Sequence, residues 1–420
     1  MYINLKLLFT LRRYLDLLNK KAYKILIFYY FILLYTVHSN GFVKQYSLLY
    51  FFYVIPVYLF VVINIPLILT TAFNKQTRLL YIFVCIVFFI SACRLDFQSI
   101  SNIGGITFLL IIIVNSQLCV SLKFINSLFL TAICCSFVAY LFNQNVYGLV
   151  PGFGKTNIID TIDTGVRVSL FPNIIESSLF SVFVFIVNFS FNKSKSIFLF
   201  TPLALYFILF SGNRTSIILV IIFVSLFLLF KIVKIKHRRF YLIFPFLLIS
   251  MLIITYNPFV IASISNNLDS AFLKTLLFRS IEDSEIETNM QNTLIRLWIW
   301  DQHMIVFLQS PFIGVGTFDF TKIANEHDFL KEIPSDGTES FITGLLARVG
   351  IVASFFFAFF IVYINKAILL GKKFSYTIPI MLLYVLFFYA SFFTAYNFIT
   401  LLWFGMFNFE DRINQIATNA

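Results

Sequence analysis

Long apolar runs, separated by short polar clusters, dominate the chain. A helix that crosses a bilayer needs about 20 mostly apolar residues, whereas a barrel strand would alternate every second residue. The pattern therefore predicts about twelve membrane-spanning helices. They are expected near residues 22–37, 47–70, 78–93, 103–120, 124–142, 175–191, 196–211, 215–231, 241–256, 342–364, 376–394 and 397–409. Leucines and basic residues intermingle over the first 21 residues, which suggests an amphipathic segment at the membrane surface.

Composition narrows the class of protein further. Of the 420 residues, 60% are hydrophobic and only 12% charged, whereas soluble chains carry about 45–50% apolar and about 25% charged residues. A soluble enzyme, a disordered chain and a disulfide-stapled secreted domain are thus excluded. The net charge of +12 sits in short clusters between apolar runs, as in membrane loops rather than on a nucleic-acid-binding face. We expect an all-α polytopic membrane protein with residues 1–420 in one integral membrane domain.

Charge asymmetry predicts the orientation. With both termini inside, the cytoplasmic segments hold 20 of the 31 Lys and Arg and three acids, a net charge of +17, against 11 bases and 16 acids elsewhere. By the positive-inside rule, both termini are expected in the cytoplasm. Two outer segments, 143–174 and 257–341, are too long to be simple connections. The second, between spans nine and ten, is the large loop, and long loops are usually functional.

Five arginines lie on or near the predicted outer face, where basic residues are otherwise scarce. They are Arg167, Arg214, Arg279, Arg296 and Arg348. Because arginine is always charged and binds phosphate through two parallel hydrogen bonds, this set suggests an anionic lipid-linked substrate. Arg348 falls at membrane depth, where an ionisable group is either functional or a structural cation that pairs with an acid or snorkels to the surface.

Glu339, at the start of the tenth span, is either a functional acid or a solvated carboxylate stabilised by the helix dipole. Upstream, residues 293–308 predict an amphipathic helix on the membrane surface. Gly314 and Gly316 follow it and permit a tight turn.

No metal and no cofactor are expected. The four histidines are too scattered for a zinc motif. The acidic run 282–287 could in principle hold a hard cation, but a solvated acidic surface is the preferred interpretation. Nucleic acid is not expected as a partner.

Four stretches together resemble the superfamily of O-antigen polymerases (Wzy-type) and O-antigen ligases of bacterial envelope polysaccharide assembly. These stretches are Arg167–Asn173, Ser211–Ser216, Arg296–Gly316 and Glu339–Ile351. Their order matches, as do the number of spans and the large loop before the last few. The resemblance covers most of the chain from about residue 100 to 365.

The resemblance implies a GT-C-like fold in the bacterial inner membrane and a metal-independent glycosyl transfer at the periplasmic face. The substrates would be undecaprenyl-diphosphate-linked glycans, among membrane lipids, with a chain-length regulator as a protein partner left open. The family's short-turn arginine corresponds to Arg214 and its large-loop arginine to Arg296. With Glu339 as general base, these three would be catalytic, while Arg167, Arg279 and Arg348 would bind substrate.

The last motif separates two activities within this superfamily. Ligases usually begin it with His-Asn, and this chain has Glu339-Ser340, which favours a repeat-unit polymerase over a ligase acting on lipid A-core. A polysaccharide flippase is the alternative outside the enzymes, but such transporters usually have two similar halves, and the sequence has no internal repeat. A non-catalytic scaffold would leave the arginines unexplained.

Overall fold

The computed structural model describes the helical part of the chain and the segments that connect some of its helices. The described residues are 5–36, 50–71, 74, 77–96, 103–116, 118–142, 148–151, 167–172, 174–191, 197–232, 299–316, 341–369, 399, 401, 402 and 405. Within them, all regular structure is helical apart from a single β-bridge that pairs Gly148 with Val168. The all-helical fold class expected from the apolar runs is therefore found in this part of the chain.

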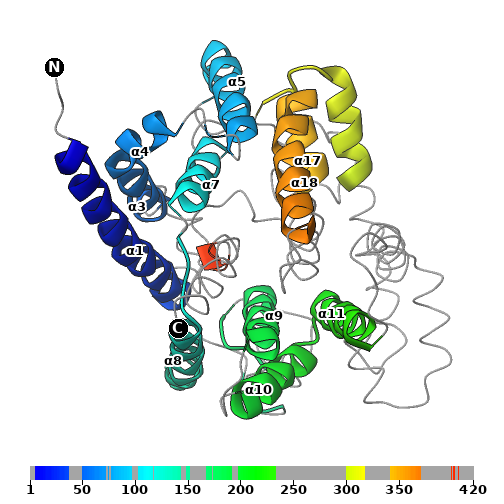
Figure 1. Cartoon of the computed structure of the whole chain (residues 1–420). Helices are drawn as coiled ribbons and strands as arrows, with labels where there is room; N and C mark the ends of the chain where they lie inside the picture. Colours follow the sequence, from blue (N-terminus) through cyan, green and yellow to red (C-terminus); the bar gives the residue numbers. More distant parts are fainter. Residues whose placement is uncertain are drawn as a thin grey trace.

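Most helices of the described part coincide with apolar runs of the sequence. In chain order they are α1 (Leu5–Thr36), α3 (Tyr50–Ile63), α4 (Ile65–Thr70), α5 (Arg78–Arg94), α7 (Gly105–Asn115), α8 (Leu122–Leu141), α9 (Ile174–Phe191), α10 (Ile197–Phe210), α11 (Arg214–Ile232), α17 (Phe341–Val349), the 3-10 turn η6 (Gly350–Val352) and α18 (Ala353–Leu369) (Figure 1). Residues 299–309 form a further helix within the predicted large loop, termed the loop helix.

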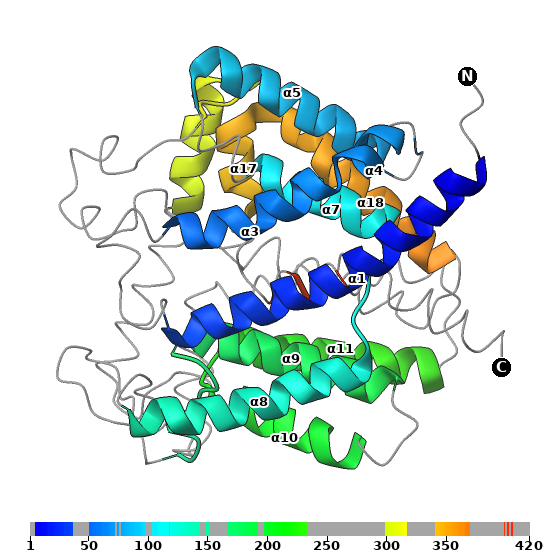
Figure 2. The same ribbon diagram turned by 90° about the vertical axis from the view of Figure 1, so that its left-hand side faces the viewer.

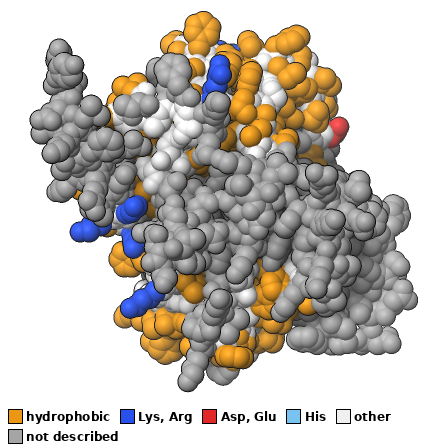
Figure 3. All heavy atoms as spheres, in the orientation of Figure 1, with side chains coloured by type: hydrophobic (Ala, Val, Ile, Leu, Met, Phe, Trp, Pro, Cys, Tyr) orange, Lys and Arg blue, Asp and Glu red, His pale blue; other side chains and the backbone are white. Residues whose placement is uncertain are grey.

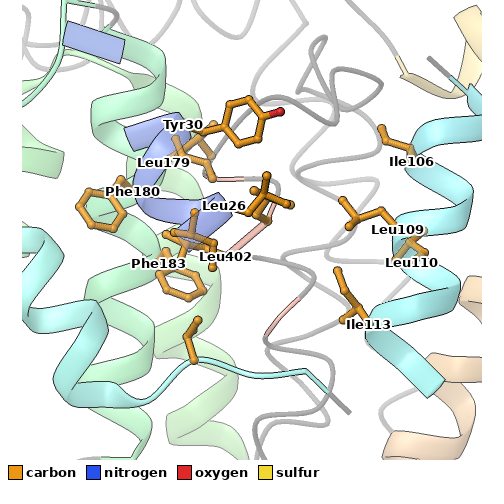
Figure 4. Close-up of a cluster of buried hydrophobic side chains, with 14 of the residues drawn as sticks. Leu26, Tyr30, Ile106, Leu109, Leu110, Ile113, Leu179, Phe180, Phe183 and Leu402 are labelled. Carbon is orange, nitrogen blue, oxygen red and sulfur yellow. The ribbon is translucent and has the colours of Figure 1, made fainter. Parts of the chain in front are cut away.

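The helices lie side by side in two groups. Figure 2 shows α3, α4, α5, α7, α17 and α18 on one side of α1, and α8 to α11 on the other. Side chains from α1, α7 and α9 meet between the groups around Leu402 (Figure 4). Tyr30 and Phe180 in this cluster are 1% and 0% exposed. The core is thus apolar and aromatic, as the 57 phenylalanines lead one to expect.

The outer surface of the bundle is also apolar. Phe89 and Phe198 are 71% and 82% exposed, and Figure 3 shows hydrophobic side chains over much of the described surface. Among the described residues, two helices are long and apolar enough to cross a membrane, Leu122–Leu141 and Ile342–Val362, and three more apolar helices are shorter. Helices that are apolar both inside and outside suit a lipid environment. The number of twelve spans stays a prediction.

Helix boundaries agree with the apolar runs at some spans and depart from them at others. For α9, α10 and α11 they fall within one residue of expectation. The expected span 47–70 is wrong as one helix, because it breaks at Asn64 between α3 and α4. Asn64 is buried there and accepts a hydrogen bond from Asn19 of α1 at 2.6 Å. A hydrogen bond from α1 therefore stabilises the residue at which the helix breaks.

Two further differences concern the N-terminal segment and the tenth predicted span. The expected surface segment at the N-terminus is not separate from the first span. From Leu5 onward it belongs to α1, which continues without a break to Thr36. The expected tenth span is interrupted at Gly350, where α17 gives way to η6. The expected spans 241–256 and 376–394 lie outside the described residues, and so does most of 397–409. The single-domain organisation and the extent of the large loop stay predictions.

Candidate functional site

The segment 167–172 lies against the short turn that joins α10 to α11, although α9 and α10 separate the two in sequence. The backbone N–H of Val168 donates to the carbonyl of Phe210 at 2.9 Å. Gly212 in the turn has φ of +67°, and a β-carbon placed on it would lie 3.5 Å from Nε of Arg167. The Arg167 side chain therefore lies directly on the turn. Two of the four motifs singled out in the sequence thus form one structure.

Side chains from three helices hold the backbone of this extended segment, termed the platform. The contacts are Ser169 N to Gly148 O at 3.3 Å, Leu170 N to Ser177 Oγ at 2.8 Å, Ser136 Oγ to Ser169 O at 3.0 Å and the Tyr35 hydroxyl to Leu170 O at 2.7 Å. Buried backbone N–H and C=O groups are nearly always paired, and here the partners are side chains of α1, α8 and α9 and the backbone of Gly148. The platform is thereby fixed in one conformation.

The platform places a buried arginine beside the turn. Arg167 is buried, at 7% exposed, and a guanidinium stays protonated even when buried. Arg214 is the first residue of α11, two positions after Gly212. The first turn of a helix also carries a partial positive charge. The sequence-predicted Arg167 and the backbone of Arg214 thus flank the same turn, while the Arg214 side chain lies outside the described part.

The glycine turn after the loop helix has the tight geometry that the sequence predicts. Gly314 and Gly316 have φ of +65° and +81°, a region that side-chain-bearing residues rarely adopt. A β-carbon on Gly314 would overlap the backbone of Arg348 and Val349. The absence of a side chain at this position lets the turn contact the backbone of the α17–η6 junction.

Backbone hydrogen bonds join this turn to the break in the tenth predicted span. They are Val315 N to Ala347 O at 2.9 Å, Gly316 N to Arg348 O at 2.9 Å and Ile351 N to Pro311 O at 2.8 Å. An interrupted helix leaves carbonyl groups without their usual helical donors, and the turn supplies those donors. Arg348, predicted as a substrate-binding residue, is 7% exposed and sits at this junction.

The structure buries His303, an ionisable residue to which the sequence analysis gave no role. His303 of the loop helix is 1% exposed, and its Nδ1 lies 2.9 Å from Oγ1 of Thr343 in α17. A β-carbon on Gly344 would lie 3.6 Å from His303 Cε1, so the imidazole packs on the first turns of α17. The spacing of Ile299, His303 and Val306, which are all buried, is the signal that could have placed this histidine on the inner face.

Three predicted site residues, Arg279, Arg296 and Glu339, lie outside the described residues. Their proposed roles rest on sequence alone. The part of the chain that the structure describes contains no group of three or more His, Cys, Asp or Glu side chains placed to hold a metal. In the described part of the chain, the platform therefore contacts the α11 turn, and the loop helix contacts α17.

Figure 2 shows the loop helix beside the start of α17, at the end of the bundle where α1 finishes and α9 begins. The described part is thus a bundle of apolar helices with polar turns at this end, near the start of α11 and the start of α17.

Residues 199–358 match the O-antigen ligase family (Wzy_C), and this part of the chain is a domain of that family. The match includes α10, α11, the loop helix, the glycine turn and α17. Members of the family are polytopic membrane proteins of O-antigen and lipopolysaccharide biosynthesis that transfer lipid-linked glycans as ligases or polymerases. No curated protein matches the chain.

Proposed function

We propose that the protein is a glycosyltransferase that polymerises undecaprenyl-diphosphate-linked oligosaccharide repeat units at the outer face of the bacterial inner membrane. The growing glycan on its lipid diphosphate is the donor. The terminal sugar of a new lipid-linked repeat unit is the acceptor. The lipid tails would lie along the apolar helices. The sugars would occupy the end of the bundle where the loop helix lies.

The placement of Arg167 on the turn that precedes Arg214 is the observation that supports this proposal most directly. A diphosphate leaving group needs fixed, always-charged donors with bidentate geometry. Two arginines at one turn, beside the first turn of a helix, are suited to that task. The hydrogen-bonded platform preorganises one of them, and preorganised charge is worth most in catalysis.

The proposed reaction breaks the bond between the anomeric carbon of the donor glycan and an oxygen of its diphosphate. A new bond forms between that carbon and a hydroxyl oxygen of the acceptor sugar. Glu339 takes the hydroxyl proton as general base. The negative charge left on undecaprenyl diphosphate is neutralised by Arg214 and Arg296, assisted by Arg167 and Arg279, while Arg348 binds substrate. No metal takes part.

Polymerase is preferred to ligase because Glu339-Ser340 stands where ligases usually carry His-Asn. The ligase remains the second candidate, since the family that matches residues 199–358 is described as O-antigen ligase. The two differ in the acceptor: a polymerase extends one lipid-linked glycan with another, whereas a ligase needs lipid A-core.

Reconstitution of the full chain separates these activities. The purified protein is placed in vesicles with the lipid-linked repeat unit, with or without lipid A-core, and products are separated by length. We expect a ladder of longer lipid-linked glycans without lipid A-core. Transfer that occurs only when lipid A-core is added would show a ligase and refute the polymerase.

A further inference from the structure

A buried serine of α9 is the meeting point of three hydrogen bonds at the α11 turn. Ser178 Oγ donates to the carbonyl of Ile175 at 2.9 Å. It accepts from Nδ2 of Asn213 at 2.7 Å and from the hydroxyl of Ser216 at 3.0 Å. Ser178 and Ser216 are fully buried, and Asn213 is 5% exposed. This Ser178 junction therefore joins α9 to both sides of Arg214.

The bonding capacity of Ser178 is filled at this junction. A serine hydroxyl has one donor and two acceptor positions, and all three are used. Without the hydroxyl, Asn213 and Ser216 would each lose a hydrogen-bond partner in a buried site, and an unsatisfied buried polar group is destabilising. The simplest relief is a shift of the turn away from α9, toward any water that can replace the lost partner.

The residues held by Ser178 determine where α11 begins. Ser216 N donates to the carbonyl of Asn213 at 3.1 Å, which forms the first turn of the helix. Asn213 N in turn donates to Ser211 Oγ at 3.2 Å. Arg214 lies between the two residues that Ser178 holds, so its backbone cannot move without breaking at least one of these contacts.

We propose that Ser178 is a positioning residue that fixes the backbone of Arg214, and so sets where that arginine meets the diphosphate of the substrate. Ser178 itself touches no reacting atom. The proposal rests on the function proposed above for Arg214. It assigns to α9, which lies before residues 199–358, a direct part in the architecture of the site.

The test compares two serines of the same helix. Ser181 is as fully buried as Ser178, and within the described residues its hydroxyl makes one hydrogen bond, to the carbonyl of Ser177 in α9, at 2.9 Å. Both substitutions therefore remove a buried hydroxyl from α9, but of the two it is Ser178→Ala that removes contacts with the α11 turn. The full chain in detergent is assayed for glycan transfer at matched amounts of folded protein, with inorganic pyrophosphate added as a competing diphosphate.

We expect Ser178→Ala to transfer glycan more slowly and to need roughly tenfold more pyrophosphate for half-inhibition, the change that follows loss of one charge-assisted hydrogen bond. Ser181→Ala should match the parent protein in both measurements. A purely structural defect would lower the amount of active protein without changing the pyrophosphate concentration for half-inhibition. If Ser178→Ala does not fold, Ser216→Ala, which removes one of the three contacts, carries the same test.

Two results would overturn the positioning role: unchanged pyrophosphate inhibition in Ser178→Ala, or equal changes in Ser178→Ala and Ser181→Ala. Arg214→Lys is assayed in parallel to separate this role from the proposed function. Normal transfer by Arg214→Lys would refute the function proposed for the arginine. Impaired Arg214→Lys beside a normal Ser178→Ala would refute the positioning role alone.

Discussion

Replacing Gly350 by alanine should release the glycine turn from the break in the tenth predicted span. Gly350 has φ of +65°, and a β-carbon there would lie 2.6 Å from the backbone N of Gly314 and 2.6 Å from the carbonyl carbon of Phe312. An L-residue in this region costs about 1–2 kcal/mol. The overlap is with backbone, so the turn must move as a unit. Each of its three hydrogen bonds to the junction adds roughly 0.5–1.5 kcal/mol. The expected destabilisation of the docked loop is about 2.5–6.5 kcal/mol.

Gly344→Ala is the matched control in the same predicted span. Its β-carbon would lie 3.6 Å from His303, an ordinary contact, and alanine favours a helix over glycine by about 1 kcal/mol. Thermal unfolding of the purified protein and glycan transfer are measured for both variants. Gly350→Ala should unfold at a lower temperature and lose transfer, while Gly344→Ala should retain both. Parent-like stability and transfer in Gly350→Ala would refute the docking of the turn.

Three further predictions concern topology, the base and the loop helix. Alkaline phosphatase fused at Asn292 or Ser335 should be active and at Lys236 inactive; activity at Lys236 would overturn the orientation. Glu339→Gln should abolish the long-chain ladder on a gel and keep the single repeat unit on lipid core, because an amide cannot take the proton. A full ladder would exclude Glu339 as the base, and loss of the single-unit band would indicate a ligase. His303→Ala should lower both the unfolding temperature and the transfer rate through loss of its contact with α17, and unchanged values would contradict its role in holding the loop helix.

The sequence predicted helices where local composition decides them. The run that became α11 is bounded by the polar turn at Gly212 and by the basic cluster after Ile232, so its ends are visible in the chain itself. The break at Asn64 was not predictable in the same way. It depends on Asn19, a distant residue of α1, and a single asparagine in an apolar run does not reveal its partner.

The sequence predicted which residues belong to the candidate site, but it did not predict how they are arranged in space. Charge and chemistry singled out Arg167 and Arg214, but the contact of Arg167 with Gly212 depends on how α9 and α10 fold back. Gly350 similarly looks like an ordinary small residue within a membrane helix. Its need for a positive φ arises only because the turn 311–316 docks there. From the sequence, Ser178 is simply a polar residue near the start of a predicted span. Its contacts with the α11 turn are visible only in the structure.

We propose that the α11 turn, with Arg167 and Arg214, binds the diphosphate leaving group, and Arg214→Lys tests this role most directly. Lysine keeps the charge but cannot reproduce the planar, bidentate guanidinium. Arg78→Lys is the matched control, because Arg78 is likewise the first residue of an apolar helix but is solvent-exposed and predicted to face the cytoplasm.

The measurement is the rate of polymer formation from the lipid-linked repeat unit, at matched protein amounts. We expect Arg214→Lys to lose most polymerisation, by about tenfold or more, while Arg78→Lys polymerises like the parent protein. Polymer formation by Arg214→Lys at the parent rate would contradict a bidentate role for this arginine, and with it the diphosphate site.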